Sequence, residues 1–428
     1  MKRILVKNLY NEVNNEVCIK GWVHKIRKLS KVSFLILRDR TGLIQCVVDN
    51  NVDIKDIKLE SVIEIVGKVV EGKNKISNVE IQVEELRVIS KVQEELPIEV
   101  NKEELDVNLE TILDHRVLSL RHEKINSIFK IQSIIAQGFR EYLINEGFTE
   151  MFTPKIVSEG AEGGTAIFKV KYFEREAYLA QSPQFYKQMM VGAGYERVFE
   201  IAHVYRAEEH NTSRHLNEYV SMDLEMGFIE DEREIMKLET GILKHIMLKL
   251  TNECKDLLDT CHIELPKIKE TIPSITFSQA INILEKEYGK LCEEGDLDPQ
   301  GEKLICKYAE EKLGSEFLFI TDYPRKKRPM YTMPKDKEFT HSFDLLFRGL
   351  EITTGGQRIH EHSMLKENMI YKGLNPDNFT AYMEVFKYGM PPHGGLAIGL
   401  ERLTSQILGL KNVREASLFP RDRTRILP

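Results

Sequence analysis

The chain has 428 residues, of which 42% are hydrophobic and 30% charged, a composition typical of a globular protein with more than one domain. No apolar run approaches the roughly 20 residues of a membrane-spanning helix, so we expect no membrane partner. The six cysteines are scattered and form no CxxC pair, which argues against structural zinc and a disulfide scaffold and predicts a cytoplasmic protein.

The net charge of −7 hides a basic segment near the start of the chain. Residues 20–40 contain seven Lys or Arg against one acidic residue. A polyanion could bind there through phosphate contacts while the rest of the surface stays acidic.

Five β-branched runs follow one another in the first hundred residues, separated by Gly, Asn, Asp and Lys: EVCIKGWVHKI, SFLILRD, LIQCVVD, VIEIVGKVV and VEIQVEELRVI. This pattern predicts a closed OB-fold barrel over residues 1–95, a fold that commonly binds single-stranded nucleic acid. A barrel without a ligand would give the same pattern. Trp22 and Phe34 lie in the basic segment and favour nucleic acid.

Residues 96–124 are mixed in character and predict a hinge. A second domain, 125–428, is then predicted to be α+β, with a mostly antiparallel sheet flanked by helices. Its first element is a helix from Ile125 to Glu146, because apolar residues recur there at helical spacing and Gly147 follows. Residues 231–312 are charged and amphipathic, which predicts a largely helical region of unassigned role.

The stretch FEIAHVYRAEEHNTSRHLNEY, residues 199–219, is dense in alternating charges after an apolar run. Arg206 is expected at the end of a strand beside Glu208, where a planar arginine held by a carboxylate can bind a phosphate. A salt-bridged hairpin on the surface explains this stretch equally well.

Two further segments carry candidate site residues. In FDLLFRGLEITTGGQRIHEH, Glu351 and Thr354 offer hard oxygen ligands that suit Mg²⁺ bridging phosphates, and a predicted Gly-Gly-Gln-Arg turn brings Arg358 nearby. In GGLAIGLERL, glycines permit close approach of a ligand, and Arg402 could stack on a base. A tight strand-to-helix turn would also explain the glycines.

The segment LAQSPQFYKQMM places Gln184 and Lys187 one helical turn apart. A lysine there beside Arg358 would form a small cationic pocket suited to a carboxylate. Alternatively, Lys187 extends from a core helix to solvent.

The order of these segments resembles the three signature motifs of class II aminoacyl-tRNA synthetases: GFTEMFTPKI, VYRAEEHNTSRHLNEY and GGLAIGLERL. With SPQFYKQ, ITTGGQRIH and the ending LFPRDRTRILP, nearly the whole chain resembles the archaeal-type aspartyl-tRNA synthetases. The resemblance implies ATP-dependent attachment of L-aspartate to tRNA(Asp) through an aspartyl-adenylate, and leaves open whether tRNA(Asn) is charged too.

By this resemblance, Arg206, Glu351 and Arg402 are the catalytic residues, and Glu351 and Thr354 hold Mg²⁺. ATP is expected to contact the following residues: Arg206, Ala207, Glu208, Arg214, His215, Leu216, Glu351, Gly399, Leu400, Glu401 and Arg402. Aspartate is expected to contact the following residues: Glu162, Gln184, Lys187, Arg206, Thr354 and Arg358.

The resemblance also implies that the barrel reads the anticodon through Arg27, Phe34 and Gln45, with His24 favouring the type that charges both tRNAs. The helix before Pro154 matches the dimer motif of the class, which implies a homodimer. Three rivals stay open: an asparaginyl-tRNA synthetase, which generally lacks the lysine at position 187; a non-catalytic tRNA-binding paralogue; and a free-standing asparagine synthetase, which would not need the barrel.

Overall fold

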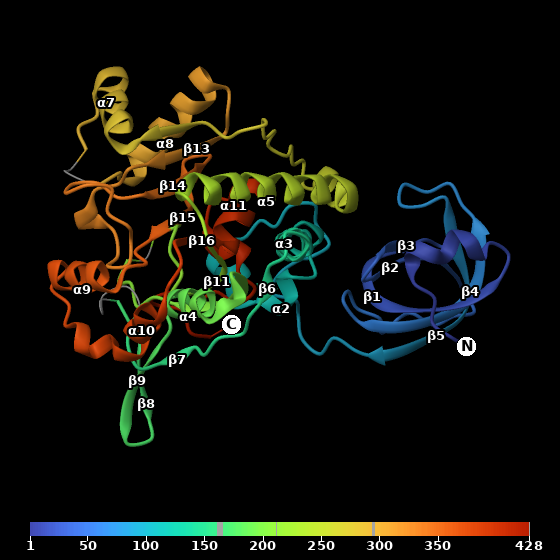
Figure 1. Ribbon diagram of the computed structural model, residues 1–428. Coiled ribbons are helices and arrows are strands. Elements are labelled where there is room, and N and C mark those ends of the chain that lie inside the picture. The colour runs from blue at the N-terminus through green and yellow to red at the C-terminus, as the bar shows by residue number, and fades with distance from the viewer. Residues whose placement is uncertain (161–165, 211, 293–295, 428) are drawn as a thin grey trace. The chain divides into compact units, whose positions relative to one another are not determined.

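The computed structural model describes residues 1–160, 166–210, 212–292 and 296–427. They form two compact units, Met1–His122 and Glu123–Pro428 (Figure 1). The division falls inside the predicted hinge, which contains the short helices α1 (Leu109–Asp114) and α2 (Arg116–Ser119). None of the described helices is long and apolar enough to cross a membrane.

The first unit is a closed five-stranded barrel of order β1-β2-β3-β5-β4, as the sequence predicts. Its strands are β1 (Glu16–Lys28), β2 (Val32–Asp39), β3 (Gly42–Asp49), β4 (Val62–Glu71) and β5 (Val79–Ser90). Alternation defines the inside: in β3, Ile44, Cys46 and Val48 are buried while the residues between them are partly exposed. The 3-10 helix η1 (Val6–Glu12) adds Leu9 to this core.

The described part of the second unit contains an eight-stranded sheet whose neighbours are antiparallel except for the two edge pairs, which are parallel. The strands, in spatial order, are β12 (Ser274–Thr276), β13 (Phe317–Thr321), β14 (Ser342–Phe347), β15 (Leu350–Arg358), β16 (His393–Gly399), β11 (Glu218–Gly227), β10 (Arg197–Tyr205) and β6 (Thr149–Glu150). This confirms the predicted α+β architecture.

Three helices pack on one face of this sheet: α3 (Glu123–Asn145), α5 (Glu232–Glu253) and α11 (Leu400–Leu408). In α3 the buried residues Ile128, Ile131, Ile135 and Phe139 recur at helical spacing, so one stripe of the helix faces the core. Figure 1 shows α5 lying beside α3, and α11 also packs on α3.

The other face of the sheet carries α7 (Phe277–Tyr288) and α8 (Pro299–Tyr308), which pack on Leu318 and Ile320 of β13 and Leu346 of β14. The helices α4 (Gln184–Met190), α9 (His362–Tyr371) and α10 (Thr380–Val385) share a methionine-rich cluster. Region 231–312 is largely helical, as predicted, and also includes α6 (Lys255–Thr260) and the short strand β12. A small sheet of β7 (Ile156–Val157), β9 (Arg175–Leu179) and β8 (Lys169–Tyr172) ends in a hairpin that projects from the unit (Figure 1).

The predicted Gly-Gly-Gln-Arg turn is wrong, because these residues lie in β15. Gly355 pairs with Phe343 and Leu396, and Gly356 pairs with Ser342 and Gly395. A Cβ at Gly355 would lie 2.4 Å from the Phe343 ring, and one at Gly356 would lie 2.6 Å from the His341 carbonyl oxygen. The glycines therefore let neighbouring strands and side chains pack closely instead of reversing the chain.

Candidate active site

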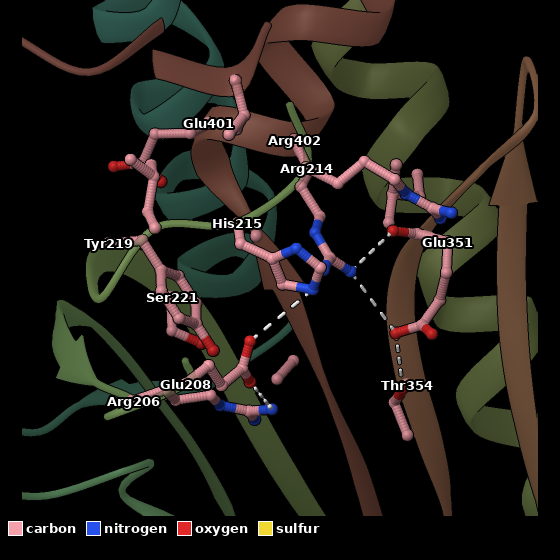
Figure 2. Close-up of a pocket in the computed structure, with 15 residues that line it drawn as sticks. Arg206, Glu208, Arg214, His215, Tyr219, Ser221, Glu351, Thr354, Glu401 and Arg402 are labelled. Carbon is pink, nitrogen blue, oxygen red and sulfur yellow. Dashed lines mark hydrogen bonds and ion pairs between the residues drawn. The ribbon is translucent and has the colours of Figure 1, made fainter. Parts of the chain in front are cut away.

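A pocket in the second unit brings together most of the residues predicted to bind ATP (Figure 2). Its wall comes from the β10–β11 loop, β11, β15, β16 and the start of α11. The lining residues are Arg206, Glu208, Arg214, His215, Leu216, Tyr219, Ser221, Glu351, Ile352, Thr354, Ala397, Gly399, Glu401, Arg402 and Val413.

The β10–β11 loop supplies an arginine and a histidine that both face Glu208. Arg206 Nη1 lies 3.9 Å from one carboxylate oxygen of Glu208, and His215 Nε2 lies 3.6 Å from the other (Figure 2). Asn217 fixes the loop because its amide donates to the carbonyl oxygens of Arg206, at 2.7 Å, and Glu208, at 3.0 Å. Burial lowers the pKa of His215, and Arg402 acts in the same direction while Glu208 opposes it. Sequence reasoning missed Asn217.

The opposite wall combines a carboxylate, a hydroxyl and an arginine. Thr354 Oγ1 donates to Glu351 Oε1 at 3.0 Å, and Arg402 Nη1 donates to the Glu351 carbonyl oxygen at 3.0 Å. Arg402 Nη1 also lies 3.7 Å from Glu351 Oε1 (Figure 2). A carboxylate and a hydroxyl facing a pocket fit Mg²⁺, which usually takes one or two carboxylates and completes its shell with water and phosphate.

Glu401 lines the pocket but is buried and braces the fold. The backbone N–H of Val220 donates to both of its carboxylate oxygens at 3.1 Å, which ties the start of α11 to β11. Burial raises the pKa of Glu401 to about 8. Two predicted ATP contacts lie outside this pocket: the side chain of Leu400 is in the apolar core, and Ala207 lines a neighbouring cavity.

A second cluster, formed by Lys187, Asp223, Glu225 and Arg358, lies behind Ser221. Lys187 is 1% exposed, and its Nζ lies 3.0 Å from Asp223 Oδ1 and 3.4 Å from Glu225 Oε2. Arg358 Nε donates to Glu225 Oε1 at 3.1 Å. Ser221 lines the pocket described above and donates to Asp223 Oδ2, so the pocket and this cluster are neighbours.

This cluster corrects the expectation of a strongly cationic pocket, because two buried carboxylates accompany the two cations. Burial alone would raise the pKa of Glu225, but Arg358 and Lys187 together hold it below its usual value. Asp223 and Glu225 were missed, although two acids spaced by two in the apolar strand segment SMDLEM had to share one face. The alternative in which Lys187 extends to solvent is also wrong, because the residue is buried.

Gln184, at the start of α4, is buried and donates through its amide to Gln188 at 3.0 Å. Glu162, the remaining residue expected to select the amino acid, lies outside the described residues.

The outer face of the barrel gathers the residues expected to read the anticodon. Arg27 of β1 is the cross-strand partner of Phe34 in β2, and Gln45 of β3 is the partner of Ile36, two residues further along β2. His24 lies at a bulge in β1, with its Nδ1 3.1 Å from Arg38 Nη1. Burial and the Arg38 charge lower the pKa of His24.

Comparisons with known proteins agree with both units. Residues 108–423 match the family "tRNA synthetases class II (D, K and N)", and residues 17–89 match "OB-fold nucleic acid binding domain". The first match covers well over half of the chain. It confirms the class expected from the three motifs, and the second confirms the OB-fold.

Individual relatives match along the whole chain. An "Aspartate--tRNA(Asp/Asn) ligase" of Thermus thermophilus is 48% identical over 100% of both chains. An "Aspartate--tRNA(Asp) ligase" of Thermoplasma volcanium is 43% identical over 97% of both chains. The structure of an asparaginyl-tRNA synthetase from Pyrococcus horikoshii with asparaginyl-adenylate superposes with a TM-score of 0.93, at 29% identity over 100% of both chains. The chain therefore belongs to the class II tRNA synthetases of the D, K and N group, and within it to the aspartate–tRNA ligases.

Proposed function

We propose that this synthetase joins L-aspartate to tRNA in two steps, with the two neighbouring sites holding ATP and aspartate. In the first step an oxygen of the aspartate α-carboxylate attacks the α-phosphorus of ATP, and pyrophosphate leaves. In the second step the terminal ribose hydroxyl of tRNA attacks the adenylate carbonyl, and AMP leaves. The observation that carries the proposal is the buried Lys187–Arg358 pair directly behind the pocket of Arg206 and Arg402.

Arg206 is the residue we assign to the reacting centre. It stands at the end of β10, its loop is fixed by Asn217, and it faces the pocket beside Glu208. A guanidinium there can pair with the α-phosphate and the substrate carboxylate at once and stabilise the charge that builds up in the transition state. Arg402, anchored to the Glu351 carbonyl, can hold the adenine ring or a phosphate.

Glu351 and Thr354 are the residues that would hold Mg²⁺. The ion would neutralise negative charge on the phosphates as pyrophosphate leaves. The protein groups orient the ATP tail independently: Arg214 and His215 face the same pocket from the opposite loop.

Selection of aspartate over asparagine is the task of the buried cluster. The Arg358 guanidinium suits bidentate pairing with the side-chain carboxylate of aspartate. Arg358 and Lys187 lie close together because both form ion pairs with Glu225. An asparagine amide replaces one carboxylate oxygen by an NH2 group, so a donor meets the Arg358 guanidinium where aspartate offers a second acceptor, a mismatch worth about 1–3 kcal/mol. The shared fold does not separate the two activities, because the asparaginyl relative superposes over its whole length.

We further propose that the enzyme charges both tRNA(Asp) and tRNA(Asn). The relative at 48% identity carries the Asp/Asn name, and the relative at 43% carries the Asp name alone. We assign this relaxed anticodon reading, in which both tRNAs are accepted, to His24. This residue is half-buried against Arg38.

A homodimer in the cytoplasm is the proposed state of the protein. The segment around Pro154 follows α3, and it exposes Phe152 by 87% and Ile156 by 51%. Exposed apolar side chains on one short segment are suited to burial by a second copy of the chain.

The test of the reaction is aspartate-dependent exchange of labelled pyrophosphate into ATP. The wild-type protein should exchange with aspartate and not with asparagine, and Arg206→Ala should abolish exchange while its circular dichroism and melting stay unchanged. Exchange retained by Arg206→Ala would refute the assigned role. Exchange with asparagine would refute the assignment of the buried cluster.

The test of the tRNA range is attachment of labelled aspartate to two transcripts that differ in the anticodon. Charging of both supports the relaxed reading, and charging of the aspartate transcript alone refutes it.

A further inference from the structure

Helix α8 lies in the region to which the sequence assigned no role. One of its carboxylates lies behind the wall of the pocket that is proposed to bind ATP. The helix is fixed at its start because Asp298 accepts from the backbone N–H of Gly301 at 2.7 Å and Pro299 occupies the first turn. Ile305 and Cys306 anchor it in the apolar cluster below β13 and β14. Glu302 is the buried acid of this helix, with a side chain 10% exposed.

A single oxygen of Glu302 joins two parts of the pocket wall. Its Oε2 accepts from Nη2 of Arg214, in the β10–β11 loop, and from the backbone N–H of Glu351, at 3.0 Å. Arg214 and Glu351 both line the pocket, and Glu302 does not. The carboxylate therefore supports the wall from behind, without facing the substrate.

This arrangement leaves the arginine able to bind a phosphate. A guanidinium carries five N–H groups, so an acid behind it can hold its plane while other N–H groups meet an anion in front. The Arg214 side chain is 19% exposed, and the loop that carries it is otherwise a long connection between two strands. Without a fixed partner, the Arg214 side chain would lose its rotamer freedom only when ATP binds, and this loss of entropy would weaken binding.

We propose that Glu302 is a positioning residue for ATP, which holds Arg214 and the start of β15 in the arrangement that receives the polyphosphate. This rests on the proposed function, in which Arg214 and Glu351 face the ATP tail. Through Glu302 the helical region 231–312 contributes to the reaction, although none of its described residues lines the pocket. The binding of aspartate, which falls to the cluster around Lys187, does not depend on Glu302.

The experiment compares Glu302→Ala and Glu302→Gln with Glu310→Gln, which removes a charge from an exposed position just after the same helix. Pyrophosphate exchange is measured against ATP and against aspartate. Glu302→Ala should raise KM for ATP about tenfold and leave KM for aspartate within about twofold, since a tenfold change corresponds to about 1.4 kcal/mol of lost binding. Glu302→Gln keeps an acceptor oxygen and should recover most of this loss. Glu310→Gln should match the wild type.

A double-mutant cycle with Arg214→Ala separates positioning from general damage. The effect of Glu302→Ala on KM for ATP should shrink at least threefold once Arg214 is absent. An unchanged KM for ATP, an equal rise of both KM values, or full additivity in the cycle would each overturn the inference. Absence of exchange in the wild-type protein would instead refute the proposed function itself.

Discussion

Glu239 of α5 gives the stability of the second unit an unusual dependence on pH. The residue is fully buried, and its carboxylate lies beside the Thr353 hydroxyl. Burial raises the pKa of Glu239 from 4.5 to about 8; the Thr353 hydroxyl opposes this rise, and the charge of Asp344 adds to it. The folded protein therefore holds a proton at neutral pH that the unfolded chain releases.

The direction in which stability changes with pH follows from the difference between the folded and unfolded pKa of Glu239. Below pH 4.5 both states are protonated and Glu239 costs nothing, whereas between pH 4.5 and pH 8 only the unfolded state ionises and stability falls as pH rises. At 1.36 kcal/mol per unit, the loss between pH 5 and pH 8 is about 3 kcal/mol. Glu239→Gln cannot ionise and should escape this loss.

The assay is the melting temperature of the wild type and of Glu239→Gln across pH 5 to 8. The difference between the two should grow with pH and reach about 6 °C in favour of the variant at pH 8, at roughly 2 °C per kcal/mol for a unit of this size. Glu310→Gln, which changes an exposed acid, should follow the wild-type curve. Parallel curves for the wild type and Glu239→Gln would refute the reasoning.

Three further predictions concern function and assembly. Phe34→Ala should raise KM for tRNA at least about fivefold, since a stacked base contributes about 1–3 kcal/mol, and should spare tRNA-independent pyrophosphate exchange; equal loss of both activities would mean a structural role. Lys187→Met leaves Asp223 and Glu225 buried with one cation fewer, so it should lower stability by about 3–5 kcal/mol, measured by urea unfolding, and abolish aspartate-dependent exchange; an unchanged midpoint would contradict the buried pairing. Sedimentation equilibrium should give twice the chain mass of 49.6 kDa, and Phe152→Asp should shift it to the monomer; a monomeric wild type would refute the dimer.

The elements of both units could be predicted from local patterns. Alternating β-branched runs located all five barrel strands, and helical spacing located α3, because each of these elements buries one face or stripe against a nearby core. The Gly-Gly-Gln-Arg segment was misread because glycine pairs are typical of turns. In β15 their role is to accept neighbours at distances that no Cβ would tolerate, which depends on strands distant in the sequence.

The site shows the same limit. Arg206, Glu351 and Arg402 could be found because their segments match known motifs. Glu302 could not, because its contact with Arg214 spans 88 positions and its own segment looks like any amphipathic helix. Charge pairing across the fold is decided by topology, which local periodicity does not encode.

Gly395 shows how narrow the choice of residue is beside the amino-acid site. A Cβ there would lie 2.1 Å from Glu225 Oε2 and 2.2 Å from the Leu224 carbonyl oxygen, so even alanine would displace the acid that holds Lys187 and Arg358. Laboratory evolution of this enzyme toward other amino acids should therefore return glycine at position 395 in every active clone. New specificities would have to arise from the side chains that ring the site, while the strand beneath it stays invariant.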